Sequence, residues 1–206
     1  MTPWLKTIAA SLVVGCAGAA VLWTTTESGR ALTSEGARRV RALAAPTLVP
    51  DVVLTDRHDQ PLRLRRGDGS ITLVEFIYTT CPLICQSAGA AFLRLQGLLQ
   101  QAGLATDVRL LSVTFDLERD GPAELEVYEK VHQADGSQWR IVRPSPQDLE
   151  SLLQAFGVVV LPDPVLGFEH NAAIHVVSEG RLVGIFDLED IDGVMKQVAA
   201  VRRGRT

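Results

Sequence analysis

Two apolar segments most constrain the fold that this chain can adopt. ITLVEFIY (71–78) and VRLLSVTF (108–115) are long enough for buried strands and rich in β-branched and aromatic residues. The first precedes a segment with apolar residues at helical spacing, and the second precedes a helix-start pattern. A strand–helix–strand unit brings its strands together in parallel through a right-handed crossover. The sequence therefore predicts an α/β fold.

The segments on either side predict how this pair is extended. Residues 52–56 and 61–65 are expected to form a hairpin, and residues 172–186 form two further strands about a Glu-Gly turn. Helices are expected at residues 82–102, 120–132, 145–157 and 190–201, the second with Asp120 as its N-cap. This order of elements predicts a thioredoxin-like sheet with an N-terminal β-hairpin.

The length and charge of the chain permit one compact domain and an appendage. The chain has 206 residues and a net charge of −4, so electrostatics give no reason to expect a nucleic-acid partner. We expect residues 1–24 to be a membrane anchor or signal segment and residues 25–49 to be a linker with a short helix near 35–43. Residues 50–206 are then the folded domain.

The N-terminal segment contains an uncharged apolar run from Thr7 to Trp23. The run is near the lower length limit of a spanning helix, and Trp4 and Trp23 bracket it as aromatic residues do at membrane interfaces. Residues 12–16 also resemble a bacterial lipobox, in which Cys16 becomes the lipidated N-terminus. Both interpretations export the domain and tether it to a membrane, and we favour the uncleaved anchor helix.

Two of the three cysteines lie in FIYTTCPLIC (76–85), where an apolar strand meets a helix. Cys81 and Cys85 are four residues apart, a spacing that puts both on one face of a helix. A helix N-terminus favours thiolate over thiol. A disulfide across three residues closes too short a loop to stabilise the fold much. The pair is therefore a redox couple or part of a metal site, and the spacing alone does not separate the two.

FIYTTCPLIC resembles the FxYTxCPxxCP signature of the Sco/SenC family, membrane-tethered copper proteins with a thioredoxin fold. Three further segments are similar to family sequences in the same order: SVTFDLERDGPAELEVY (112–128), SPQDLESLLQAFGV (145–158) and GFEHNAAIHVV (167–177). The similarity extends over nearly all of residues 50 to 200, which makes it more specific than any one motif.

The resemblance implies a copper site whose ligands are Cys81, Cys85 and His170. Two thiolates select Cu(I), and an added imidazole also makes Cu(II) acceptable. The implied function is that of a metallochaperone that delivers copper to the dinuclear copper site of cytochrome c oxidase, or reduces its cysteines. Its partner is then the copper-bearing oxidase subunit or another copper donor or acceptor protein. The domain is expected to face the bacterial periplasm or another exported compartment.

Three departures from the family pattern lie close to these ligands. Leu83-Ile84 stands where the family commonly has Asp-Val, Gln86 where it has Pro, and Glu169 where it has Asp. The first change removes a carboxylate from the surroundings of the metal, which favours Cu(I).

The main alternative is an enzyme, a thiol–disulfide oxidoreductase in which Cys81 attacks and Cys85 resolves. A peroxide-reducing enzyme that depends on Cys81 is a third possibility on the same fold. The sequence does not decide whether the protein is an enzyme.

The other histidines and the acidic run are expected to be structural. His175 is interpreted as a packed strand residue, and His132 and His58 as surface groups. The run DLERD (116–120) is interpreted as a solvated loop with a helix cap.

Overall fold

The computed structural model describes residues 3–25, 33–65, 69–81, 84–165 and 167–204, and it divides into two compact units. The first unit, Met1–Ala45, contains helices α1 (Pro3–Thr25) and α2 (Ser34–Ala44). Among the described residues, no helix is both long and apolar enough to cross a membrane. The anchor expected at residues 1–24 therefore stays a prediction.

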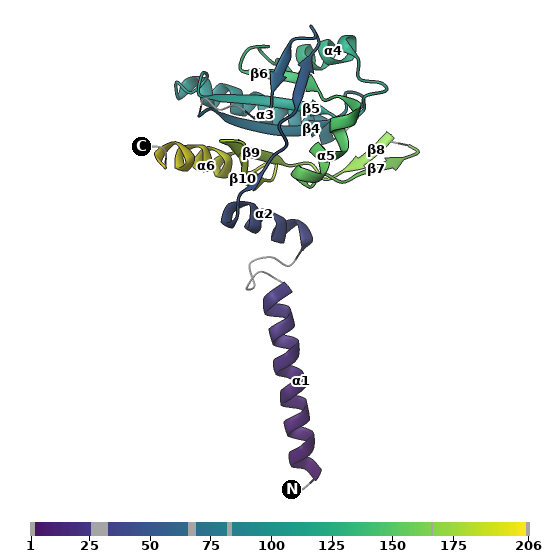
Figure 1. Ribbon diagram of the computed structural model, residues 1–206, viewed down its shortest axis with the longest axis vertical. Helices are drawn as coiled ribbons and strands as arrows, with labels where there is room; N and C mark the ends of the chain where they lie inside the picture. The colour runs from purple at the N-terminus through teal and green to yellow at the C-terminus, as the bar shows by residue number, and fades with distance from the viewer. Residues whose placement is uncertain (1–2, 26–32, 66–68, 82–83, 166, 205–206) are drawn as a thin grey trace. The chain divides into compact units, whose positions relative to one another are not determined.

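The second unit, Pro46–Thr206, is built on an eight-stranded mixed sheet with the order β1-β10-β9-β4-β5-β6-β2-β3 (Figure 1). The strands are β1 (Thr47–Leu48), β2 (Val53–Asp56), β3 (Pro61–Arg63), β4 (Ile71–Ile77), β5 (Val108–Thr114), β6 (Trp139–Arg143), β9 (Ile174–Ser178) and β10 (Arg181–Phe186). β5 pairs in parallel with β4 on one side and β6 on the other, and the other described pairs are antiparallel. All residues of β4 and β5 are buried, as a central parallel pair requires.

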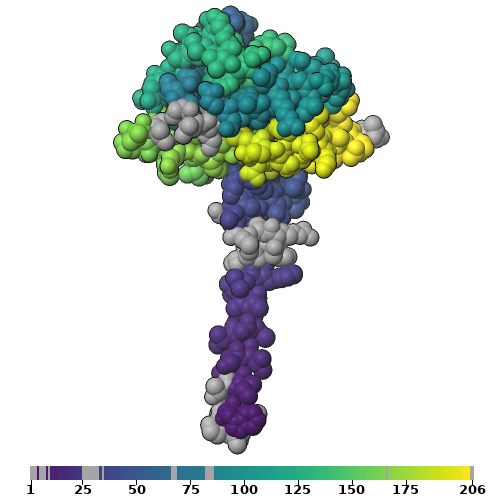
Figure 2. All heavy atoms as spheres, turned by 180° about the vertical axis from the view of Figure 1, so that it is seen from behind, coloured from purple at the N-terminus to yellow at the C-terminus, as the bar shows by residue number. Residues whose placement is uncertain are grey.

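Helices cover both faces of this sheet. They are α3 (Ile84–Gln101), α4 (Pro122–His132), α5 (Pro146–Phe156) and α6 (Ile191–Arg203). Phe92 of α3 packs on Trp139 of β6, whereas Phe156 of α5 packs on Phe76 of β4, which points to the opposite face. α4 packs beside α3, and α6 packs on β9 and β10. Figure 2 shows the atoms of α6, in yellow, next to those of the α3 region, in teal.

Most of the expected elements are present. β2 and β3 form the first hairpin, and β9 and β10 form the second about Glu179 and Gly180, which both have positive φ. α5 begins after Ser145, whose side chain accepts a hydrogen bond from the Asp148 amide, and ends at left-handed Gly157. The parallel strand β6 was not expected, because Arg140 and Arg143 interrupt the apolar pattern of WRIVR.

The expected start of α4 is wrong by one residue. Its N-cap is Gly121, whose amide donates to the Glu124 carboxylate at 3.0 Å, and not Asp120. The Asp120 carboxylate is occupied elsewhere, since it accepts hydrogen bonds from Thr79 and Thr114. α3 begins at Ile84, and residues 82–83 before it lie outside the described residues.

One acidic side chain interrupts the apolar core on the α3 side of the sheet. Glu75 of β4 is fully buried, and its Oε1 accepts a hydrogen bond of 2.5 Å from the Ser112 hydroxyl. Ser112 in turn accepts one of 2.8 Å from the Trp139 indole, while Glu75 Oε2 has no hydrogen-bond partner among the described residues. Burial raises the pKa of Glu75 to about 8, so the carboxyl is mostly neutral at pH 7.

Glu75 is therefore expected to make folding stability fall with rising pH. Its pKa is higher in the folded chain than the 4.5 of the unfolded chain, so its penalty is absent below pH 4.5 and complete above about pH 8. The full penalty is on the order of 5 kcal/mol. Urea unfolding at pH 5, 6.5 and 8 should show this decline in the wild type and a flatter profile in Glu75→Gln. Equal pH slopes for the two proteins would contradict the assignment.

Candidate metal centre

The cysteine motif lies at the carboxyl end of β4, where the chain turns into α3. Cys81 is buried, with 7% of its surface exposed, and its amide donates to the Tyr78 carbonyl at 3.2 Å. Cys85 is the second residue of α3, and its side chain lies outside the described residues. The backbone therefore places both cysteines at the junction of a strand end and a helix N-terminus, where the helix dipole stabilises negative charge.

His170 ends a small second sheet formed by β7 (Val160–Asp163) and β8 (Gly167–His170). Figure 1 shows this hairpin standing apart from the main sheet. Neither buried ring nitrogen of His170 has a hydrogen-bond partner among the described residues. Burial lowers the pKa of His170, and the Asn171 backbone only partly opposes this effect. The ring is therefore neutral at pH 7, the form in which one nitrogen offers a lone pair to a metal.

Two aromatic rings contact His170, and a third packs against both of them. The Tyr78 and Phe115 rings lie edge-on to the imidazole, with centroids 6.2 and 5.1 Å away, and Phe168 packs against both of them. Tyr78 follows β4 and Phe115 follows β5, so the ends of the two parallel strands meet the hairpin at one place. Tyr78 thus links the two segments, since its carbonyl accepts the Cys81 amide and its ring contacts His170.

Polar contacts hold the hairpin against the strand ends. The Tyr78 hydroxyl donates to the Phe168 carbonyl at 3.1 Å. The Arg119 guanidinium lies 5.1 Å from the centroid of the Phe168 ring and pairs with Asp116 at 2.6 Å. At the open end of the hairpin, the Asn171 side chain accepts a hydrogen bond from the Val159 amide at 2.7 Å. These contacts restrain the residues on either side of His170.

Of the three side chains expected as ligands, the structure describes those of Cys81 and His170. No three His, Cys, Asp or Glu side chains among the described residues are placed to hold a metal ion, and the Cys85 side chain is not in that set. The structure places the Cys81 turn between the end of β4 and the start of α3, and Tyr78 of the same strand end contacts the His170 ring. The donor types suit a soft metal, because thiolate and imidazole are preferred by copper.

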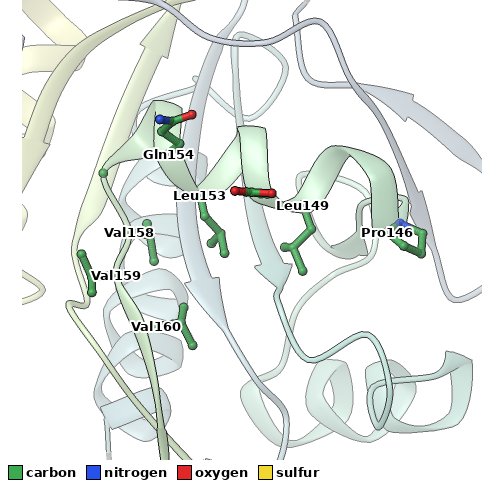
Figure 3. A pocket seen from close by; sticks show the side chains of 9 residues that line it. Pro146, Leu149, Leu153, Gln154, Val158, Val159 and Val160 are labelled. Carbon is green, nitrogen blue, oxygen red and sulfur yellow. The ribbon is translucent and has the colours of Figure 1, made fainter.

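A groove of about 630 Å³ lies between α5 and β7, beside the hairpin (Figure 3). Its lining is mostly apolar and includes Leu149, Leu153 and Val160. Neither Cys81 nor His170 lines it, so the groove is separate from the candidate metal centre.

The burial expected from the sequence is correct for two of the remaining histidines and wrong for the third. His175 is buried between the Phe76 and Phe156 rings, with Nδ1 3.2 Å from the Val74 carbonyl, which confirms a packed strand residue. His58 is exposed, as expected. The surface position expected for His132 is wrong, because the ring stacks on Tyr128 and fills the space that the missing side chain of Gly89 leaves.

The solvated loop expected at residues 116–120 is also wrong. Asp116 and Asp120 are both buried, and only Glu118 and Arg119 of the run are exposed. Asp116 pairs with Arg119, while Asp120 accepts hydrogen bonds from Thr79 and Thr114. One sequence signal could have indicated that Asp120 is buried. Thr79 and Thr114 lie at strand ends, where buried hydroxyl groups need hydrogen-bond acceptors.

A comparison with models of protein families shows which family the chain resembles. The model of the SCO1/SenC family matches residues 41–202. The chain belongs to this family. A protein of Stutzerimonas stutzeri whose name describes it as copper-binding is 28% identical over 114 residues, which are 55% of this chain and 54% of that protein. The match thus spans only about half the length of that relative.

Solved structures of family members confirm the thioredoxin-like fold. A SCO1/SenC lipoprotein from Bacillus anthracis has a TM-score of 0.69 at 17% identity, with 78% of this chain and 99% of that chain covered. Arabidopsis thaliana ScoI, solved with copper bound, gives 0.63 at 19% identity, with 75% and 99% covered. Apo Sco1 from Thermus thermophilus gives 0.61 at 26% identity, with 78% and 93% covered.

Proposed function

We propose that this SCO1/SenC protein is a copper carrier whose ligands are Cys81, Cys85 and His170. The observation that carries the proposal is the half-buried His170 side chain, whose two ring nitrogens are themselves buried and have no hydrogen-bond partner of normal geometry among the described residues. A buried polar group without a partner destabilises the fold, and a metal ion that accepts its lone pair removes that penalty.

The surroundings of the proposed ligands suit copper as a cargo. Aromatic rings around His170 exclude water and keep the imidazole neutral, so a proton does not compete with the metal. The start of α3 favours the thiolate form of the cysteines. Copper(I) accepts two thiolates and one imidazole, and an incoming thiolate of a partner can replace these ligands one at a time. The protein would thus release copper by ligand exchange.

The proposed partner is the copper-bearing subunit of cytochrome c oxidase. Family membership supports this proposal, since BsSco, which shares the fold at 21% identity, is described as a member of a family of cytochrome c oxidase assembly proteins. The protein would deliver copper to the dinuclear site of that subunit or reduce its cysteines. Another copper donor or acceptor protein is the corresponding partner if the oxidase is not the target.

A thiol–disulfide oxidoreductase remains the second candidate. The disulfide switch identified in BsSco supports it, since it is a case of disulfide chemistry in a member of the Sco family. Against it, Cys81 is only 7% exposed, whereas an attacking thiolate must reach the sulfur of its target disulfide.

Copper titration of the reduced full chain tests the proposed function. One equivalent of Cu(I) is expected to bind the wild type, and His170→Ala is expected to weaken binding by at least about tenfold because one ligand is lost. His58→Ala is the matched control, since His58 is exposed and should leave the affinity unchanged. Wild-type affinity in His170→Ala would refute the ligand assignment, and reductase activity would then be the better account.

We also propose that residues 1–24 export the domain and tether it to a membrane on the periplasmic or another exported side. The lipoprotein of Bacillus anthracis supports a tether on this fold. Mass spectrometry of the chain from the membrane fraction measures its N-terminus. An intact segment is expected for an anchor helix, and a chain that begins at lipidated Cys16 indicates the lipoprotein form. A chain found only in the soluble fraction contradicts both forms of tether.

A further inference from the structure

Asp120 is a fully buried carboxylate at the carboxyl ends of β4 and β5. Its Oδ2 accepts the Thr79 amide at 3.0 Å and the Thr114 hydroxyl, and its Oδ1 accepts the Thr79 hydroxyl at 2.6 Å. Three donors from two strand ends thus converge on one side chain, which itself belongs to the loop before α4. Hydrogen bonds to an ionised carboxylate are roughly twice as strong as those between neutral groups.

The role of a helix cap does not explain this arrangement. Gly121 occupies the N-cap of α4, and Glu124 satisfies its amide. The backbone of Asp120 is separately bonded to the Asp116 carbonyl at 2.9 Å. The side-chain carboxylate instead accepts its hydrogen bonds from Thr79 and Thr114, and these three donors offset the cost of burying it.

The bonds to Thr79 fix the backbone immediately before the cysteine turn. The Asp120 carboxylate accepts hydrogen bonds from both the amide and the hydroxyl of Thr79. These two bonds restrict the backbone rotation of Thr79. Two residues later, the Cys81 amide is bonded to the Tyr78 carbonyl. The turn that carries Cys81 is thus restrained at both ends, and its Tyr78 end is the one that contacts His170.

We propose that Asp120 is a positioning residue for the metal centre, which holds the Cys81 turn in the ligand-competent conformation before copper binds. The inference rests on the proposed function, since it assigns a role toward the same site. Preorganised ligands bind more tightly because the ordering cost is met on folding and not on binding. Loss of a group that orients a ligand typically lowers metal affinity by 10- to 100-fold.

Asp135 provides a matched control. Its Oδ1 accepts the amides of Ser137, Gln138 and Trp139 at 3.0, 2.8 and 3.0 Å, so it is also a carboxylate with several donors. Strands β4, β5 and β6 are parallel. Asp135 precedes the amino end of β6, whereas Cys81 follows the carboxyl end of β4, so the two residues lie at opposite ends of the parallel strands. Asp135→Ala should destabilise the fold without disturbing the cysteine turn.

Cu(I) affinity of the reduced full chain, measured by competition with a chromophoric chelator, tests the proposal. Asp120→Ala is expected to lose about 10- to 100-fold in affinity, and Asp120→Asn, which keeps one acceptor oxygen, should lose less. Asp135→Ala is expected to remain within about threefold of the wild type, and because Asp135 is exposed it should lower Tm less than Asp120→Ala does. An unchanged affinity in Asp120→Ala, or an equal loss in Asp135→Ala, overturns the positioning role.

A second readout does not need copper. Alkylation of Cys81 in the metal-free chain, followed by fragment-resolved mass spectrometry, reports how often the turn opens. Asp120→Ala is expected to react at least about tenfold faster than Asp135→Ala, because the buried sulfur loses its restrained backbone. Equal rates refute the role. If the wild type binds no copper, the proposed function fails while this readout still decides the positioning of the turn.

Discussion

The parallel pairing of β4 with β5 is the constraint on which the site depends. The register aligns Ile77 with Thr114, so Tyr78 and Phe115 emerge side by side at the same edge of the sheet. Their rings form two walls around His170, and the polar residues beside them, Thr79 and Thr114, share Asp120. A shift of this register by one residue would separate both pairs and point them to opposite faces.

The sequence predicted the parts of the fold that have a strong periodic signal. β4, β5, α5 and the β9–β10 hairpin carry long apolar runs, caps or a Glu-Gly turn, and each lies where it was expected. The β7–β8 hairpin was missed because its residues are half-buried or exposed on both faces, so no alternation marks it as a pair of strands. His170 was placed by family resemblance, while its surroundings came only from the structure.

Burial of polar residues was the part that the sequence did not predict. Asp116 and Asp120 look like surface acids in DLERD, and their partners Arg119, Thr79 and Thr114 are recognisable only once the strand ends are in contact. His132 is buried for a similar reason, since Gly89 of a different helix makes room for its ring. Local pattern carries no information about such contacts between distant segments, which are decided by tertiary packing.

We propose that the neutral His170 ring and the two cysteines beside the start of α3 hold one copper ion. X-ray absorption at the copper edge of the Cu(I)-loaded full chain distinguishes these ligands, because sulfur and nitrogen scatter differently. Two sulfur ligands and one imidazole nitrogen are expected, with the imidazole signal lost in His170→Ala. A copper ion bound by sulfur alone in the wild type would rule out His170 as a ligand.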